Sequence, residues 1–305
     1  EEGVKIIAVY DDIADYILVK QGGKINAVGT PDKPIVMTSE KEEPGAWGGI
    51  HICGRAHTNA EGGKGSSEIG GAVYGGNDDA DNSGTLQYIR LEYTGFAFDE
   101  EHEANGISFY GVGNGTIVDH CQAYKGSDDG FEFFGGSVNV SNLVAVSCSD
   151  DSFDWTEGWN GKGTNLVAYQ EAESTLGYDC DCLMECDNNG SNNAATPVAH
   201  PVLKNLILVG NGGSKQGIRL RAGTEVEIDN AKVCGKGQPL TVETALTENA
   251  LKNGTSKLTN ITLTSELSSK EGIYTHADFI AVTSNKVDAN LSYSSFEDIR
   301  KECSW

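Results

Sequence analysis

The sequence predicts an all-β fold, a parallel β-solenoid whose coils are about 22–25 residues long with insertions. Two short strand motifs recur in phase along the chain, and little helical periodicity separates them. The alternative is an antiparallel sandwich, because several Asn-Gly pairs resemble hairpin turns. Hairpin sheets give no reason for a motif to recur at a fixed period, so we favour the solenoid.

The first motif is a polar or aromatic residue followed by an apolar-x-apolar strand. Its copies begin at Tyr88, His120, Asn142, Asn165, Asn205, Asn230 and Asn260. The steps between them are 32, 22, 23, 40, 25 and 30 residues. This spacing indicates a base period of about 22–25 residues, with insertions in three coils.

The second motif is a short strand of alternating character, at residues 105–109, 129–133, 151–155 and 216–220, with a further copy within 179–187. Because successive side chains of a strand point to opposite faces, we expect Phe131 and Phe133 to point into the solenoid and Glu132 to point outward. Equivalent positions of successive coils stack about 4.8 Å apart. The copies therefore predict one outward row: Ser108, Glu132, Asp154, Glu185 and Arg219.

Further carboxylates flank this row at Asp128, Asp129, Asp150 and Asp151. Like charges at this spacing repel, so we expect raised pKa values unless a cation lies between the groups. Calcium binds six to eight oxygen ligands. The four aspartates are therefore candidate calcium ligands.

The row permits three interpretations. It is a solvated face with turn-capping aspartates, a cation- or glycan-binding face, or a catalytic pair. For catalysis, the candidate acid and base are Glu132, Asp154 and Glu185. Neighbouring carboxyls would fit the spacing of retaining glycosidases, about 5–5.5 Å, and alternate ones the about 6.5–9.5 Å of inverting enzymes.

Three aromatic residues flank the row, namely Tyr110, Phe134 and Trp159, and are candidates for stacking on sugar rings. Trp159 lies in a Gly-rich turn, so we expect it to be exposed, although core or turn packing is an equal alternative.

Basic residues near the row have two interpretations. Arg219 and Arg221 are candidates for holding an anionic sugar. Lys125 would act either as a lyase base beside a cation or, as we favour, as an ion-pair partner. Three cysteines at 180, 182 and 186 share one parity and fit no zinc-knuckle spacing, so we expect buried thiols.

Two segments favour short helices, residues 243–252 and 296–302, the second as a possible terminal plug. Solenoids need their open ends covered. No linker or change in composition divides the chain, so we expect a single domain over residues 1–305, with a possible capping segment after about residue 236.

The formal net charge is −23, with 22 Lys and Arg against 45 Asp and Glu. Such a charge argues against binding nucleic acid and anionic membrane surfaces. No stretch is long and apolar enough to predict a membrane-spanning segment. Cations and neutral sugars are easier partners.

Several motifs occur in an order that resembles secreted or cell-surface proteins of Bacteroidetes. They lie at residues 45–50, 74–78, 81–86, 124–136 and 150–159, and the resemblance spans about residues 16–235. It implies a right-handed parallel β-helix of the pectin-lyase-like superfamily, and a secreted or outer-surface location. That superfamily includes polysaccharide lyases and polygalacturonase-like hydrolases. Asp128-Asp129 resembles a hydrolase motif, but the sequence has no Gly-His-Gly.

We therefore expect a secreted or cell-surface β-helix. Its acidic, aromatic-edged face would bind a carbohydrate or another extracellular partner, with calcium as the expected ligand. The alternatives are a polysaccharide-cleaving enzyme that uses the same face and a structural surface spacer.

Overall fold

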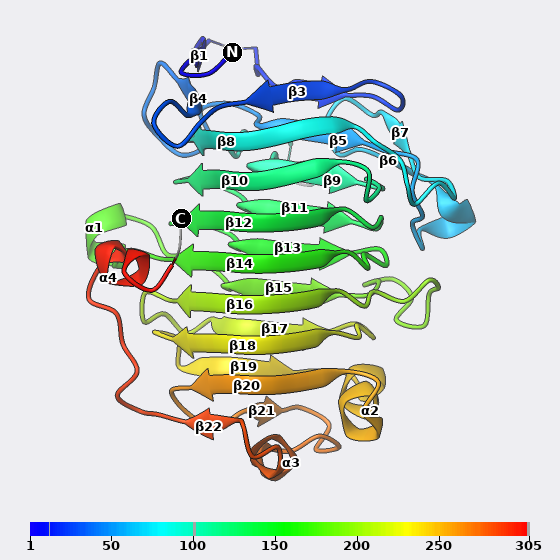
Figure 1. Cartoon of the computed structure of the whole chain (residues 1–305), viewed down its shortest axis with the longest axis vertical. Coiled ribbons are helices and arrows are strands. Elements are labelled where there is room, and N and C mark those ends of the chain that lie inside the picture. The colour runs from blue at the N-terminus through cyan, green and yellow to red at the C-terminus, as the bar shows by residue number, and fades with distance from the viewer. Residues whose placement is uncertain (12, 100–101, 304–305) are drawn as a thin grey trace.

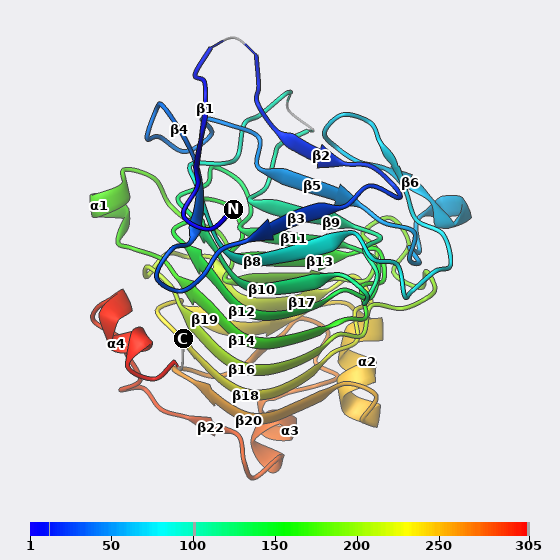
Figure 2. The same ribbon diagram turned by 45° about the horizontal axis from the view of Figure 1, so that its top comes forward.

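The computed structural model describes residues 1–11, 13–99 and 102–303, which wind into a parallel β-helix. Two parallel sheets run along the molecule, sheet A with eleven described strands and sheet B with nine (Figure 1). The oblique view in Figure 2 shows the strands of successive coils lying above one another. The predicted parallel β-solenoid is confirmed.

Sheet A holds the longer strands. In spatial order they are β1 (Lys5–Ala8), β4 (Ile35–Ser39), β8 (Gly84–Glu92), β10 (Ile117–Tyr124), β12 (Asn139–Val146), β14 (Lys162–Tyr169), β16 (Val202–Val209), β18 (Glu227–Cys234), β20 (Lys257–Leu263) and β22 (Lys286–Val287), with β3 (Ile25–Val28) also beside β8. Sheet B contains β2 (Ile17–Val19), β5 (Ile50–Cys53), β9 (Ile107–Tyr110), β11 (Phe131–Phe134), β13 (Phe153–Thr156), β15 (Met184–Asp187), β17 (Gln216–Arg221), β19 (Gln238–Val242) and β21 (Ser268–Ser269).

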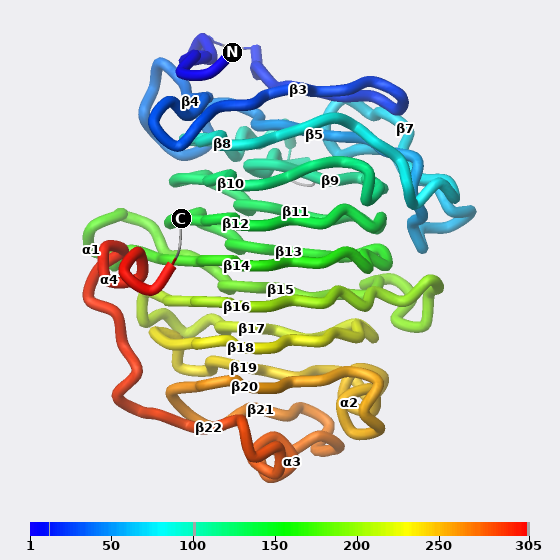
Figure 3. The backbone as a smooth tube through the Cα atoms, in the orientation of Figure 1, coloured from blue at the N-terminus to red at the C-terminus, as the bar shows by residue number. Residues whose placement is uncertain are grey.

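Smaller elements lie in the connections between the sheets. They are the 3₁₀ turn at Glu61–Gly63, the antiparallel pair β6 (Gly65–Ser66) and β7 (Val73–Tyr74), and the helices α1 (Glu173–Leu176), α2 (Ala245–Asn253) and α3 (His276–Ala281). Helix α4 (Phe296–Arg300) follows the last strand, β22. The backbone tube in Figure 3 shows these insertions projecting from the edges of the stacked coils. Loops can lengthen there without disturbing the sheets.

The register agrees with the predicted period. Phe131 of β11 pairs with Phe153 of β13, 22 residues on. Leu143 of β12 pairs with Leu166 of β14, 23 residues on. One turn of the helix therefore returns each strand to the same position, and the inward faces of sheet B form stacks of aromatic rings. Phe131 and Phe153 are 5.6 Å apart between ring centroids.

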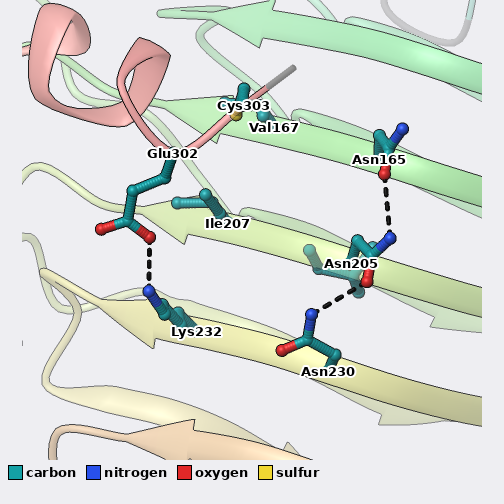
Figure 4. Close-up of a pocket in the computed structure, with 9 residues that line it drawn as sticks. Asn165, Val167, Asn205, Ile207, Asn230, Lys232, Glu302 and Cys303 are labelled. Carbon is teal, nitrogen blue, oxygen red and sulfur yellow. Dashed lines mark hydrogen bonds and ion pairs between the residues drawn. The ribbon is translucent and has the colours of Figure 1, made fainter.

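The residue that opens the first motif marks a corner within each long strand. From Tyr88 to Asn260, all seven of these residues have φ between 51° and 63°. Asn tolerates this left-handed conformation better than most residues, because its short polar side chain bonds locally. The amides also bond between coils: the Asn165 Nδ2 donates to Asn142 Oδ1 at 2.9 Å, and the Asn205 Nδ2 donates to Asn165 Oδ1 at 3.0 Å. Figure 4 shows part of this amide ladder.

The sequence placed a strand only after each of these residues, whereas the structure has strand on both sides of it. Strand β10, for example, runs from Ile117 through His120 to Tyr124. The three residues before each corner are too irregular in polarity to show as a strand in the sequence. At the first two corners, Tyr88 and His120 replace the amides, and their rings stack 4.5 Å apart.

Both predicted helices exist, but one has a different role. The segment predicted at 243–252 is α2, and that at 296–302 is α4. Helix α4 does not plug an end. It lies beside the middle coils, against the outer face of sheet A (Figure 1), where Ile299 is fully buried among Val144, Val146 and Val167. The C-terminal end of the stack is instead covered by α3, whose Phe279 joins the main core.

Candidate cation site

The outward row predicted from the second motif is confirmed by the strand register. Ser108 pairs with Glu132, Glu132 with Asp154, Asp154 with Glu185, and Glu185 with Arg219. The row continues on both sides, because His51 pairs with Ser108 and Thr241 pairs with Arg219. Backbone hydrogen bonds of sheet B therefore bring the three candidate carboxylates side by side.

A cavity of about 210 Å³ lies against one part of this row, and we call it the carboxylate pocket. All of its lining residues are acidic: Glu68, Glu103, Asp128, Asp129, Glu132, Asp150 and Asp154. Five were candidates from the sequence. Glu68 and Glu103 were missed because they lie in insertions, between β6 and β7 and between β8 and β9, which repeat no motif.

Several pocket carboxylates are held by hydrogen bonds to neighbouring groups. The Asn105 Nδ2 donates to Glu132 Oε2 at 2.6 Å, and the Tyr110 hydroxyl donates to Glu68 Oε2 at 3.0 Å. The Asp151 backbone N–H donates to Asp129 Oδ1 at 2.8 Å. One oxygen of Asp154, Oδ1, is buried without a hydrogen bond. These contacts orient the side chains and leave acceptor capacity facing the pocket.

Burial, and then mutual repulsion, raises the pKa of several carboxyls in and beside the pocket. The pKa of Glu68 rises to about 7 and that of Asp150 to about 6. Burial and the charge of Asp150 raise the pKa of Asp128 to about 7. The pKa values of the remaining buried acids rise well above the ordinary range, namely those of Asp129, Glu132, Asp151 and Asp154. A protein without a bound cation would therefore hold protons here near neutral pH.

The other end of the row is neutralised by arginine. Arg219 Nη1 lies 2.9 Å from Glu185 and its Nε lies 3.2 Å from Glu243. Arg221 Nε lies 2.7 Å from Asp187, and its Nη2 also reaches Glu185 at 2.5 Å. Both predicted sugar-binding arginines are thus engaged by the protein's own carboxylates.

Lys125 is an ion-pair partner, in agreement with the interpretation that we favoured. Its ammonium lies 3.1 Å from Glu171. Although partial burial lowers its pKa, hydrogen bonds to Glu171 and Tyr124 raise the pKa above the ordinary value overall. A lysine that holds its proton more tightly is a poor general base.

The expectation of an aromatic edge is wrong. Tyr110, Phe134 and Trp159 are 0%, 8% and 1% exposed. Trp159 stacks on Phe133 with 4.1 Å between ring centroids, and its Nε1 donates to the Val138 carbonyl at 3.2 Å. The turn that carries Trp159 folds back into the coil interior. None of the three rings is accessible for stacking on a sugar.

The three predicted buried cysteines are buried, but they do not share one face. Cys186 lies in β15 with its side chain in the core. Cys182 precedes that strand, and its Sγ lies 3.3 Å from Asp181 Oδ1 and 3.9 Å from Glu185 Oε2. The strand begins only at Met184, so alternation does not extend back to Cys182.

Three groups of side chains bring possible ligand atoms within 4.8 Å of one another. They are Asp128 with Asp129 and Asp150, Asp129 with Glu132 and Asp154, and Asp151 with Cys182 and Glu185. Opposite oxygen ligands of calcium are about 4.6–5.2 Å apart, twice the usual calcium–oxygen distance. The first two groups offer only oxygen, which hard cations prefer, and they share Asp129. The residues therefore fit calcium.

Comparisons with known proteins identify the family to which this chain belongs. No curated protein and no solved structure matches the sequence significantly. Within the described residues, no helix is long and apolar enough to cross a membrane. Residues 1–303 match the model of a family described as the pectate-lyase like beta helix domain. The chain therefore belongs to the pectate-lyase-like β-helix domain family.

Proposed function

We propose that the protein is a calcium-binding β-helix that acts as a binding module outside the cell, secreted or at the cell surface. The observation that carries the proposal is the carboxylate pocket, which is lined by seven acidic residues and no others. Among the described residues, no lysine or arginine forms an ion pair with these seven side chains. A divalent cation would relieve the repulsion between them.

Calcium would be held by Asp128, Asp129 and Asp150 or by Asp129, Glu132 and Asp154. The pocket faces outward from sheet B, so a bound ion would keep coordination positions for oxygen atoms of a partner. Hydroxyl and carboxylate groups of a carbohydrate, or of another extracellular partner, provide such atoms. Extracellular modules bind calcium with dissociation constants of about 0.1–1 mM, which suits an external location.

A calcium titration followed by thermal unfolding tests this proposal. Calcium at 5 mM is about 5–50 times a dissociation constant in this range and would stabilise the native state by about 1–2 kcal/mol, which for a chain of this length raises Tm by about 2–4 °C. We expect this shift at pH 7.5. Asp129→Asn should abolish it, because Asp129 belongs to both candidate ligand groups.

Glu173→Gln is the matched control, since Glu173 is exposed on α1, outside the pocket. It removes one negative charge and should leave the calcium shift unchanged. If the wild-type Tm does not respond to calcium, the metal proposal is rejected, and the structural spacer becomes the better interpretation. An equal response in Asp129→Asn and Glu173→Gln would instead indicate screening of the overall charge.

One observation favours a second function, the cleavage of a polysaccharide. Glu132 and Asp154 are adjacent carboxyls with raised pKa values, and Asp154 Oδ1 is buried without a hydrogen bond. A carboxyl that stays protonated near neutral pH can act as a general acid, beside a second that acts as base or nucleophile. Glu185 is less suited, because two arginines hold it.

A reducing-end assay on a polysaccharide panel tests this activity. Glu132→Gln and Asp154→Asn should each abolish the release of reducing ends while leaving the far-ultraviolet circular dichroism unchanged. Unchanged turnover in either variant, or no release by the wild type with calcium present, would reject the enzyme.

A further inference from the structure

A buried lysine lies in the turns that follow β16 and β18, two neighbouring strands of sheet A (Figure 1). Lys236 comes two residues after the end of β18 and is only 4% exposed. Its Nζ donates to the carbonyl oxygen of Cys180 at 3.0 Å and to Asn211 Oδ1 at 2.9 Å. Within the described residues, Lys236 forms no ion pair. Burying an ammonium ion without a carboxylate partner is costly.

The hydrogen bonds of Lys236 suit a neutral amine. An ammonium group has three N–H donors, whereas the neutral amine has two donors and a lone pair. The two acceptors, the Cys180 carbonyl and Asn211 Oδ1, match the neutral form. Burial lowers the pKa of Lys236, and the charges of Asp179 and Asp181 offset this only in part. A neutral lysine amine that is shielded from water is a nucleophile.

The side-chain amide of Asn211 is held beside this amine. Its Nδ2 donates to Asp179 Oδ1 at 3.0 Å, and its Oδ1 also accepts from the Gly213 backbone N–H at 3.3 Å. Because a C=O bond is about 1.23 Å long, the hydrogen bond from Lys236 places Nζ about 3.2–4.1 Å from Asn211 Cγ. Atoms that react lie about 3–3.5 Å apart beforehand. A rotation about the Cε–Nζ bond would turn the lone pair towards this carbon.

The backbone of the two turns brings the amine and the amide together. The Gly212 N–H donates to the Gly235 carbonyl at 2.6 Å, so the turns lie directly against one another. A Cβ atom added at Gly210 would lie 2.6 Å from Cγ of Lys236. Gly235 has a φ of 77°, which a residue with a side chain rarely adopts. The glycines therefore permit the close approach of Lys236 to Asn211.

We propose that Lys236 and Asn211 form an intramolecular isopeptide bond, a covalent cross-link between two coils that is independent of the proposed function. The neutral Lys236 Nζ would form a bond to Asn211 Cγ, the Cγ–Nδ2 bond would break, and Nδ2 would leave as ammonia with the proton that Nζ gives up. Asp179 would carry this proton, because both nitrogens are attached to one carbon in the intermediate and Asp179 already accepts from Nδ2. The Gly213 N–H would stabilise negative charge on Oδ1. None of these residues lines the carboxylate pocket.

Peptide mapping of the purified full chain by mass spectrometry tests this proposal. Trypsin does not cleave after an acylated lysine, so the cross-link would join peptide 205–215 to peptide 233–252. The linked pair would weigh about 17 Da less than the two peptides together, which is the mass of ammonia. We expect this pair from the wild type at pH 7.5. Asp179→Ala should lower its yield at least tenfold, because the proton then has no carrier.

Lys215→Arg is the matched control, since Lys215 is exposed in the same turn as Asn211 and pairs with Asp181. It should give the linked pair as the wild type does, whereas Lys236→Met should not. The proposal is overturned if trypsin cleaves the wild type fully after Lys236. A loss of about 17 Da within peptide 205–215 alone would also overturn it, because Asn211 would then have cyclised onto Gly212 as a succinimide. An undiminished yield in Asp179→Ala would overturn the role of Asp179.

Discussion

At the scale of single residues, backbone conformation explains the corner asparagines better than side-chain polarity does. Asn165 has a φ of 57°, and its amide bonds to the coils on both sides. The residue therefore meets two requirements at once, tolerance of the left-handed region and a donor and acceptor on one planar group. The sequence revealed its repetition, but not its position inside a strand.

Substitutions at Asn165 should separate these two requirements. Asn165→Gly keeps the left-handed conformation and loses two side-chain hydrogen bonds, which costs about 1–3 kcal/mol in the free energy of unfolding. Asn165→Val loses the same bonds and adds strain, because a β-branched residue is strongly disfavoured at positive φ, and we expect about 1–3 kcal/mol more. Urea unfolding of both variants measures the difference. Equal losses would show that the left-handed backbone adds no cost here.

The residue scale also shows why some site predictions failed. Trp159, Tyr110 and Phe134 sit beside the acidic row in sequence, and a turn in a sequence is ordinarily exposed. In a β-helix, however, turns also line the interior, and Trp159 fills it against Phe133. Tyr110 and Phe134 close strands β9 and β11 with the outward parity, but the insertion that carries Ala72 and Tyr74 packs over them.

At the scale of elements, the sequence predicted which strands pair, but it did not predict where α4 packs on sheet A. The period of the two motifs defines which residues pair, because one coil must return each strand to the same place. The position of α4 depends instead on an apolar patch on the outer face of sheet A, where Val144, Val146 and Val167 are buried beneath it. In the sequence these valines look like ordinary strand residues. Glu68 and Glu103 were not predicted as pocket residues for a similar reason, because they lie in insertions that repeat no motif.

Weakening the contact of α4 should release the C-terminal segment without unfolding the sheets. Ile299→Ala removes a fully buried side chain, a change that typically costs about 2–5 kcal/mol. We expect faster hydrogen exchange over residues 288–303 and unchanged exchange in β12 and β14. Ile280→Ala on α3 is the control, because Ile280 is 39% exposed and lies away from α4. Slow exchange of residues 288–303 in Ile299→Ala would mean that the remaining contacts hold the segment, among them the packing of Phe296 on Tyr169 and the ion pair between Lys232 and Glu302 (Figure 4).

At the scale of the whole molecule, the pocket carboxyls should control how stability depends on pH. Their pKa values in the folded protein, about 6 for Asp150 and about 7 for Glu68 and Asp128, lie above the ordinary value of about 4. Between these limits the folded state binds more protons than the unfolded state. The free energy of unfolding must therefore fall as the pH rises from about 4 to about 7.

We expect the protein in EDTA to have a higher Tm at pH 5 than at pH 7.5, and calcium to restore the loss at pH 7.5. His51 opposes this trend, since burial lowers its pKa to about 4. It is one group against the carboxyls whose pKa values are raised, namely Glu68, Asp128, Asp129, Glu132, Asp150, Asp151 and Asp154. Carboxyls with lowered pKa values, such as Asp278 and Asp298, lose their contribution only near pH 4 and below. Differential scanning fluorimetry across this range measures the effect. A Tm in EDTA that rises from pH 5 to pH 7.5 would contradict it.

The strand register has a consequence for the exchange of ions with the solvent. Glu132 and Asp154 stand on adjacent strands whose spacing is set by main-chain hydrogen bonds, so their backbones stay side by side when no metal is present. Protons then relieve the repulsion between the carboxyls, and under the proposed function calcium would bind only as those protons leave. Each binding event would release acid, so the protein would respond to a local drop in pH by giving up its calcium.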